Sequence, residues 1–240
     1  MAIPKRLRYR PRVTEAFPFL APLNEIPGIR AGWIERIPGL SITGDRDEAM
    51  RQLRSDHENA VAKFSPGHDP STWWRAEQVH GSAVAVVPGS QTILAPDGLP
   101  VVPGVDGLVT NGIGIVLAIY VADCGAIWLA DRKTGAIGLL HSGRKGTESN
   151  IFQQALDLME ERFGTSPADV TAVLSPCIRP PDYEVDFAAT IGRQADAAKL
   201  GNFIDCQLNT ASDLVRFYSY RKELGKTGRM MALLVRDSPP

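Results

Sequence analysis

The chain has 240 residues, of which 44% are apolar and 22% charged, so it can bury an ordinary globular core and is neither disordered nor fibrous. Lysine and arginine number 26 against 27 acidic residues, and the net charge of −1 gives no general field that would attract nucleic acid or an acidic membrane. No segment approaches the roughly 18 consecutive apolar residues of a membrane span. We therefore expect no nucleic-acid partner and no membrane partner.

An N-terminal extension is predicted over residues 1–27, and a single domain over 28–240. Five of the first twelve residues are basic, but the segment that follows carries Glu15 and two prolines instead of a continuous apolar stretch, which argues against a signal peptide. The cysteines are odd in number and widely spaced, which favours reduced thiols in the cytoplasm over a disulfide framework. They are Cys124, Cys177 and Cys206.

The predicted elements alternate irregularly along the chain. We expect strands over 28–34, 72–80, 83–87, 114–122, 126–130, 136–141, 170–175, 202–205, 216–220 and 229–235. We expect helices over 45–64, 147–164 and 186–201 and a shorter one over 209–215, with Thr147 and Gly164 at the ends of the second. Residues 88–107 hold four prolines and four glycines and should form a long loop. This order predicts an α/β fold, a mixed α+β sandwich of mixed sheets with flanking helices.

The stretch LLHSGRKGTESN, residues 139–150, connects a predicted strand to a predicted helix. Gly138, Gly143 and Lys145 come close to the phosphate-binding P-loop pattern. Arg144 is inserted between the second glycine and the lysine, and no serine or threonine follows in register, so a P-loop is rejected. A helix start with Arg144 and Lys145 nearby could still hold a phosphate or carboxylate, or the two cations could simply be solvated.

Two histidines and one cysteine stand at the ends of predicted strands, beside small residues: His80, Cys124 and His141. Two imidazoles and a thiolate are a competent ligand set for zinc and leave a fourth position open, as in catalytic sites. The same three residues could instead form a Cys–His nucleophile pair without a metal. His57 and His68 are assigned to structure or solvent.

Six segments together resemble the YfiH-like family in order and approximate spacing. They are EQVHG at 77–81, DGLVT at 106–110, ADC at 122–124, HSGRKG at 141–146, PCIRPPDYEV at 176–185 and FYSYRKELGKTGR at 217–229. This family is also called the laccase-domain or multicopper polyphenol oxidase family and includes the peptidoglycan editing factor. The resemblance covers about residues 28–236 and implies a fold similar to the catalytic domain of bacterial toxin deamidases, with a metal site in a surface pocket.

The resemblance also implies functional roles. His80, Cys124 and His141 would bind one metal, usually taken as zinc, with copper as the alternative. The small-molecule substrates would be a purine nucleoside and phosphate, with phosphorolysis of adenosine and inosine and deamination of adenosine. Three other functions stay open: an amidase that edits peptidoglycan precursors with a cysteine or a metal, a copper-dependent polyphenol oxidase (laccase), and a non-catalytic metal-binding protein. Blue-copper oxidases couple one copper to a cluster that needs many more ligands than the four histidines of this chain.

Further residues follow from the matched motifs. Asp123 would orient the site from its position beside Cys124. The cations expected to hold phosphate are Arg144, Lys145 and Arg221. The chain departs from the family at the first two, since the usual W-R-G is Arg144-Lys145-Gly146 here. Lysine keeps the charge of an arginine but loses its bidentate geometry toward phosphate.

Overall fold

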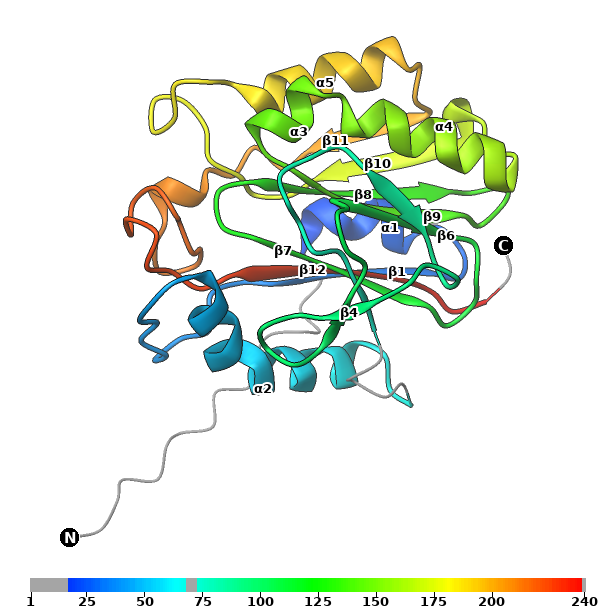
Figure 1. The fold of residues 1–240 in the computed structure, drawn as a ribbon. Coiled ribbons are helices and arrows are strands. Elements are labelled where there is room, and N and C mark those ends of the chain that lie inside the picture. Colours follow the sequence, from blue (N-terminus) through cyan, green and yellow to red (C-terminus); the bar gives the residue numbers. More distant parts are fainter. Residues whose placement is uncertain (1–16, 68–72, 239–240) are drawn as a thin grey trace, which may run out of the picture.

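The computed structural model describes residues 17–67 and 73–238. The basic residues within 1–16 and His68 lie outside the described residues. Two sheets are stacked face to face, with helices on both outer faces (Figure 1). The predicted mixed α/β fold with flanking helices is confirmed, and no helix of the described part is long and apolar enough to cross a membrane.

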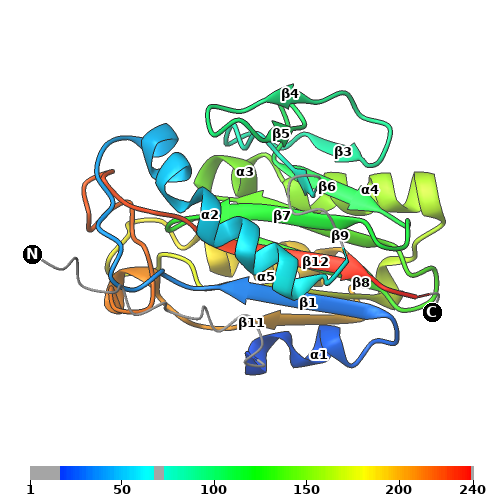
Figure 2. The same cartoon turned by 90° about the horizontal axis from the view of Figure 1, so that it is seen from below.

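The smaller of the two stacked sheets has four strands and joins the two ends of the domain. Its order is β1 (Ile29–Ile34), β12 (Met230–Arg236), β7 (Val116–Val121) and β2 (Trp74–Arg75). β12 runs antiparallel to both β1 and β7, whereas β2 runs parallel to β7. Helix α2 (Arg46–Phe64) lies across the outer face of this sheet (Figure 2). Its buried residues follow the predicted apolar stripe and include Leu53, His57 and Phe64.

The larger sheet has six strands. Its order is β11 (Asn202–Asp205), β10 (Val170–Leu174), β8 (Gly125–Asp131), β9 (Ile137–Ser142), β6 (Gly107–Thr110) and β3 (Val84–Val86). Its outer face is covered by α3 (Arg144–Glu148), α4 (Ile151–Phe163) and α5 (Phe187–Ala197), above the sheet in Figure 1. The long loop predicted over 88–107 contains a small hairpin, β4 (Ile93–Leu94) and β5 (Pro100–Val101).

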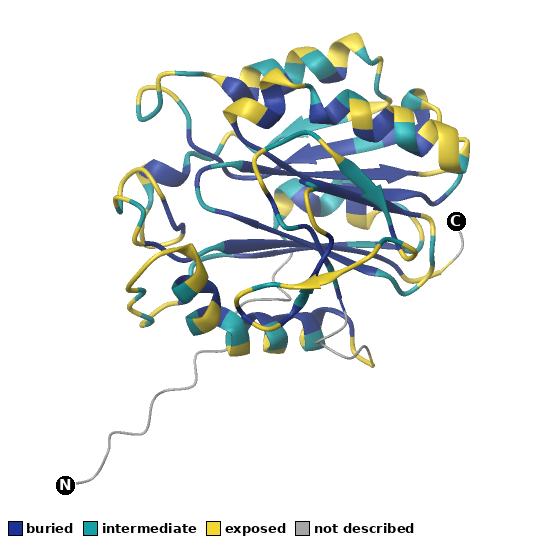
Figure 3. Cartoon of the chain, in the orientation of Figure 1, coloured by how far each residue is buried: buried dark blue, intermediate teal, exposed yellow. Residues whose placement is uncertain are grey.

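The central strands are buried on both faces, which explains why their sequences are almost free of charge (Figure 3). On β8, Trp128 faces the space between the sheets, while Ile127 and Leu129 face the helices. The indole nitrogen of Trp128 donates a hydrogen bond to the carbonyl of Leu233 on β12, 2.9 Å away, and so ties one sheet to the other.

Part of the predicted N-terminal extension packs against the domain. Residues Pro18–Leu20 form a 3₁₀ turn and Ala21–Asn24 form α1, which contacts β1 and β10. Leu20 and Leu23 are buried in the core between the sheets.

Several local predictions are wrong. Of the strand predicted over 72–80, only Trp74–Arg75 is a strand among the described residues, and the helix predicted over 209–215 is only a 3₁₀ turn at Thr210–Ser212. The helix predicted over 147–164 is interrupted at Ser149 and Asn150, and Asn150, in the left-handed conformation, caps α4 by accepting a hydrogen bond from the Gln153 amide. Thr147 is therefore not the cap and instead lies inside α3. The predicted end at Gly164 is confirmed.

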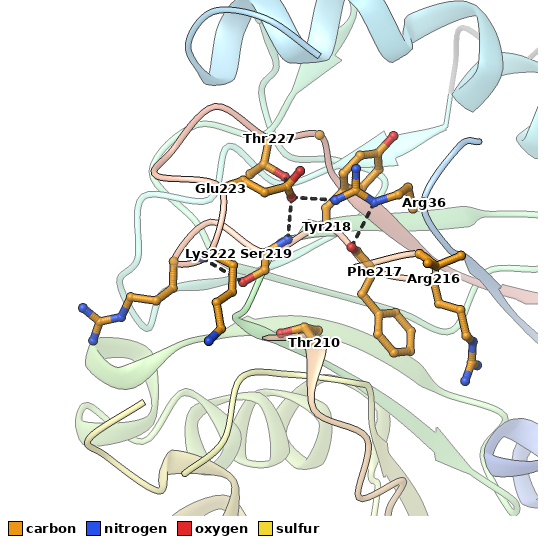
Figure 4. A network of polar contacts seen from close by, with 12 residues as sticks. Arg36, Thr210, Arg216, Phe217, Tyr218, Ser219, Lys222, Glu223 and Thr227 are labelled. Carbon is orange, nitrogen blue, oxygen red and sulfur yellow. Dashed lines mark hydrogen bonds and ion pairs between the residues drawn. The ribbon is translucent and has the colours of Figure 1, made fainter. Parts of the chain in front are cut away.

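The strand predicted over 216–220 is a loop, because polar contacts hold it (Figure 4). The Glu223 carboxylate accepts hydrogen bonds from the Ser219 amide and the Thr227 hydroxyl and pairs with Arg36 at 2.6 Å. The Arg36 guanidinium in turn lies over the Tyr218 ring. These side-chain contacts take the place of a β-ladder and fix the loop that precedes β12.

Candidate metal centre

Three strand ends bring the predicted ligands together. His141 is on β9, and the antiparallel ladder pairs it with Ala126 of β8, so that Cys124, just before β8, lies beside it. His80 comes from the loop between β2 and β3. One ligand atom from each residue lies within 4.8 Å of the other two, and the rings of the two histidines stand nearly perpendicular with centroids 4.9 Å apart. His80 is exposed, Cys124 is half-buried and His141 is buried.

Local backbone geometry positions His80. Both Gln78 and His80 have a φ of 63°, in the left-handed region that non-glycine residues rarely adopt. The Gln78 side chain donates to the Tyr120 carbonyl at 2.5 Å and accepts from the Tyr120 amide at 2.9 Å, which fastens the loop to β7. Strained conformations of this kind persist only where surrounding contacts hold them. Here the Gln78 side chain supplies such contacts.

Asp106, just before β6, is the residue that organises the site, and the sequence reasoning did not assign it a role. Its fully buried carboxylate lies 2.7 Å from Nδ1 of His141 and accepts hydrogen bonds from the amides of His80 at 2.9 Å and Gly81 at 2.7 Å. Burial raises its pKa, but the hydrogen bond and charge of His141 and the two amides hold the pKa below its ordinary value. In the sequence, Asp106 is marked only by its place in the matched segment 106–110.

The charges of Cys124 and His141 reinforce each other. Burial alone would raise the pKa of the Cys124 thiol, but the charge and hydrogen bonds of His141 and His80 lower that pKa to about 6. For His141, burial lowers the pKa, while Cys124 and Asp106 raise it to about 9. Without a metal, both shifts therefore favour the thiolate–imidazolium form of the pair.

These residues fit a zinc ion. The donor set is two imidazoles and a thiolate, as in three-ligand catalytic zinc sites. Asp106 engages Nδ1 of His141 and leaves Nε2 as the metal-binding atom, which is the usual carboxylate–histidine–metal arrangement. Position 143 must be a glycine, because a Cβ there would lie 2.5 Å from the Cys124 sulfur.

Asp123 precedes Cys124 and directs its carboxylate away from the cluster. Its φ is 81°, and its carboxylate accepts hydrogen bonds from the Thr210 hydroxyl at 2.7 Å, the Ser219 hydroxyl at 3.0 Å and the Arg221 amide at 2.7 Å. Asp123 thus ties the turn that carries Cys124 to two loops of the C-terminal third.

The three predicted phosphate-binding cations are exposed, and two of them have carboxylate partners. Arg144 pairs with Glu148 on the same helix at 2.8 Å. Arg221 pairs with Glu184, and its guanidinium lies over the Tyr183 ring. Lys145 is exposed on α3. Their role in anion binding stays a prediction.

Comparisons with known proteins agree with this architecture. Residues 39–200 and 185–237 match the profile of a family described as "Multi-copper polyphenol oxidoreductase laccase". Purine nucleoside phosphorylase YlmD of Geobacillus stearothermophilus is 30% identical over 82% of this chain and 82% of its own length. A purine nucleoside phosphorylase of Deinococcus radiodurans is 31% identical over 85% of this chain and 86% of its own.

Solved structures show the same fold. The crystal structure of YlmD from Geobacillus stearothermophilus superposes with a TM-score of 0.70 at 24% identity, covering 89% of this chain and 93% of that one. The crystal structure of the Bacillus licheniformis protein YfiH gives a TM-score of 0.72 at 22% identity, covering 88% and 94%. The family resemblance expected from the six sequence segments is confirmed.

Proposed function

Because the chain belongs to the multi-copper polyphenol oxidoreductase laccase family, also called YfiH-like, we propose that it is a metal-dependent purine nucleoside phosphorylase. The observation that carries the proposal is the assembly of His80, Cys124 and His141 in a chain that is 30% identical, over most of its length, to a protein named for that activity. The metal is proposed to be zinc, because the donor set is two imidazoles and one thiolate.

In the proposed reaction, a phosphate oxygen bonds to C1′ of the ribose while the bond from C1′ to N9 of the purine breaks. The electron pair of that bond leaves with the purine, which takes up a proton. A bound zinc ion would supply Lewis acidity and an activated water for a second activity, the deamination of adenosine. The chain's own contribution is to hold His141 through Asp106, to fix His80 through Gln78 and Asp106, and to present cations to the phosphate.

The test is turnover of inosine and adenosine by purified protein loaded with zinc, with and without phosphate. We expect free base and ribose 1-phosphate only when phosphate is present, and formation of inosine from adenosine without it. Cys124→Ser should abolish both the activity and the zinc content, whereas Cys206→Ser, at a half-buried thiol outside the cluster, should change neither. Folded, zinc-loaded protein that releases no base with phosphate would refute the phosphorylase proposal.

One observation favours a second function. The lowered pKa of Cys124 and the raised pKa of His141 describe a thiolate–imidazolium pair of the kind that cysteine hydrolases use, so an amidase with Cys124 as the nucleophile is the alternative. It predicts amide hydrolysis that survives chelation and is abolished by alkylation of Cys124. Loss of all activity on chelation, with recovery on adding zinc, would reject it.

A further inference from the structure

Arg46 is fixed beside the loop that carries His80. It is the first residue of α2 and is exposed. Its guanidinium donates hydrogen bonds to the carbonyls of Glu77 at 2.6 Å and Gln78 at 3.4 Å. Gln78 stands two residues before His80, so the positive charge is held against the segment that supplies a metal ligand.

Arg229 reaches the same region from the other side of β7. The antiparallel ladder pairs Met230 with Val121, which places Arg229 next to Ala122 and beside the turn that carries Cys124. Its guanidinium is half-buried and donates to the carbonyls of Thr227 at 3.0 Å and Gly228 at 2.9 Å. Arg46 and Arg229 therefore flank the end of β7 at the metal centre.

Among the described residues, neither Arg46 nor Arg229 has a carboxylate partner. Burial and the positive charge of Arg46 lower the pKa of Arg229 to about 10, while Cys124, Tyr220 and Asp123 act in the opposite direction. At this pKa the guanidinium stays charged at neutral pH. The carboxylate of Asp123 is already engaged by three hydrogen bonds, and the thiolate of Cys124 would be shared with a bound metal.

Three other arginines of the described residues differ in this respect. Arg36, Arg144 and Arg221 each pair with a glutamate. Within residues 17–67 and 73–238, Arg46 and Arg229 donate hydrogen bonds only to backbone carbonyls. Carbonyls orient a guanidinium without neutralising it, so its remaining N–H groups and its charge are available to an anion.

We propose that Arg46 and Arg229 form the phosphate subsite of the metal centre and bind a phosphate dianion between the His80 loop and the start of β12. This inference rests on the proposed phosphorylase function, since it names the residues that would hold that reaction's second substrate. Two planar guanidinium groups, one from the start of α2 and one from the residue before β12, suit the several oxygens of one phosphate better than a single lysine does.

The direct test is calorimetric titration of zinc-loaded protein with inorganic phosphate. We expect wild type to bind phosphate and Arg46→Gln and Arg229→Gln each to bind it at least about tenfold more weakly, because one charge-assisted contact is lost. The matched control is Arg51→Gln, an exposed arginine on the same helix that pairs with Glu48, and it should bind as wild type does. Wild type that does not bind phosphate, or variants that bind it within about twofold of wild type, would overturn the proposal.

Thermal melts establish whether each variant is folded. Arg229 is half-buried, but Arg46 is exposed, so Arg46→Gln keeps the proposal testable if Arg229→Gln does not fold. With inosine as the substrate, both variants should raise KM for phosphate while leaving KM for inosine close to wild type. Arginine-dependent phosphate binding without nucleoside cleavage would refute the phosphorylase and keep the anion site. Cleavage of inosine with an unchanged KM for phosphate in both variants would refute the anion site and keep the phosphorylase.

Discussion

Stability should fall between about pH 6.5 and pH 4 because of a single buried histidine. His57 lies on the inner face of α2, 1% exposed, with its ring centroid 5.1 Å from that of Tyr120 on β7. Within the described part of the chain, neither ring nitrogen has a hydrogen-bond partner of normal geometry. Burial is the main cause that lowers the pKa of His57 from 6.5 to about 4, and the nearby Arg75 adds to it, while the Arg229 backbone and Asp97 oppose it.

The magnitude follows from the two pKa values. The His57 side chain takes up a proton as the pH falls through about 6.5 in the unfolded chain, but only near pH 4 in the folded protein. The contribution of neutral His57 to the free energy of unfolding is therefore complete above pH 6.5 and is lost as the pH falls toward 4. A difference of about 2.5 pKa units corresponds to a loss of about 3.4 kcal/mol in the free energy of unfolding once the pH is below both pKa values. At about pH 5 the loss should already be about 2 kcal/mol.

The measurement is urea unfolding of wild type and His57→Phe at about pH 8 and about pH 5, with a chelator present so that metal binding does not contribute. Phenylalanine keeps a ring against Tyr120 and does not titrate. Other groups titrate alike in both proteins, so the wild-type free energy of unfolding should fall by about 2 kcal/mol more than that of the variant. If the two proteins lose stability equally, to within about 0.5 kcal/mol, His57 is not the group responsible.

Three further outcomes are expected. Asp106→Asn should weaken zinc binding about 10- to 100-fold in chelator competition, because the amide cannot accept every hydrogen bond that the carboxylate accepts; an unchanged affinity would contradict its orienting role. Asp97→Asn should cost about 3–5 kcal/mol in urea unfolding by leaving the buried Arg75 without its counter-ion. In metal-free protein at neutral pH, iodoacetamide should modify Cys124, whose pKa is about 6, well before Cys206, whose pKa burial raises to about 11. Zinc should protect Cys124 from the reagent. Mass spectrometry measures the modification of both cysteines.

The sequence predicts the layers well because they depend on patterns that are local. The charge-free segments are central strands, and the apolar stripe of 45–64 becomes the buried face of α2. The element ends are predicted less well. Ser149 and Asn150 interrupt a helical pattern because Asn150 can adopt the left-handed conformation and cap the next helix, which the apolar periodicity does not reveal.

The segment 216–220 has the composition of a strand, with Phe217 and Tyr218 buried, but no strand of the described residues pairs with it. The amide of Ser219 donates instead to Glu223 and its hydroxyl to Asp123, and both carboxylates lie outside the segment. Propensity describes how a side chain suits a sheet, whereas pairing depends on which strand lies alongside. A single sequence does not supply that information.

The same limit applies to the site: the sequence reveals the type of a residue, but not which residues lie together in space. His80, Cys124 and His141 could be named because their donor chemistry and matched motifs mark them, but the residues that set their geometry are ordinary aspartates. Asp106 joins the His80 loop to β9, and Asp123 joins the Cys124 turn to the loops at Thr210 and Ser219. Each buried carboxylate is satisfied by donors from segments far apart in sequence, so neither can lose its charge without leaving donors unpaired. The ligand cluster is therefore fixed by two separate anchors. Beside each anchored segment lies an arginine whose hydrogen bonds to described residues all go to carbonyls: Arg46 at the His80 loop and Arg229 at the Cys124 turn. An anion bound between those arginines would lie beside both segments, so we expect phosphate binding and metal binding each to strengthen the other.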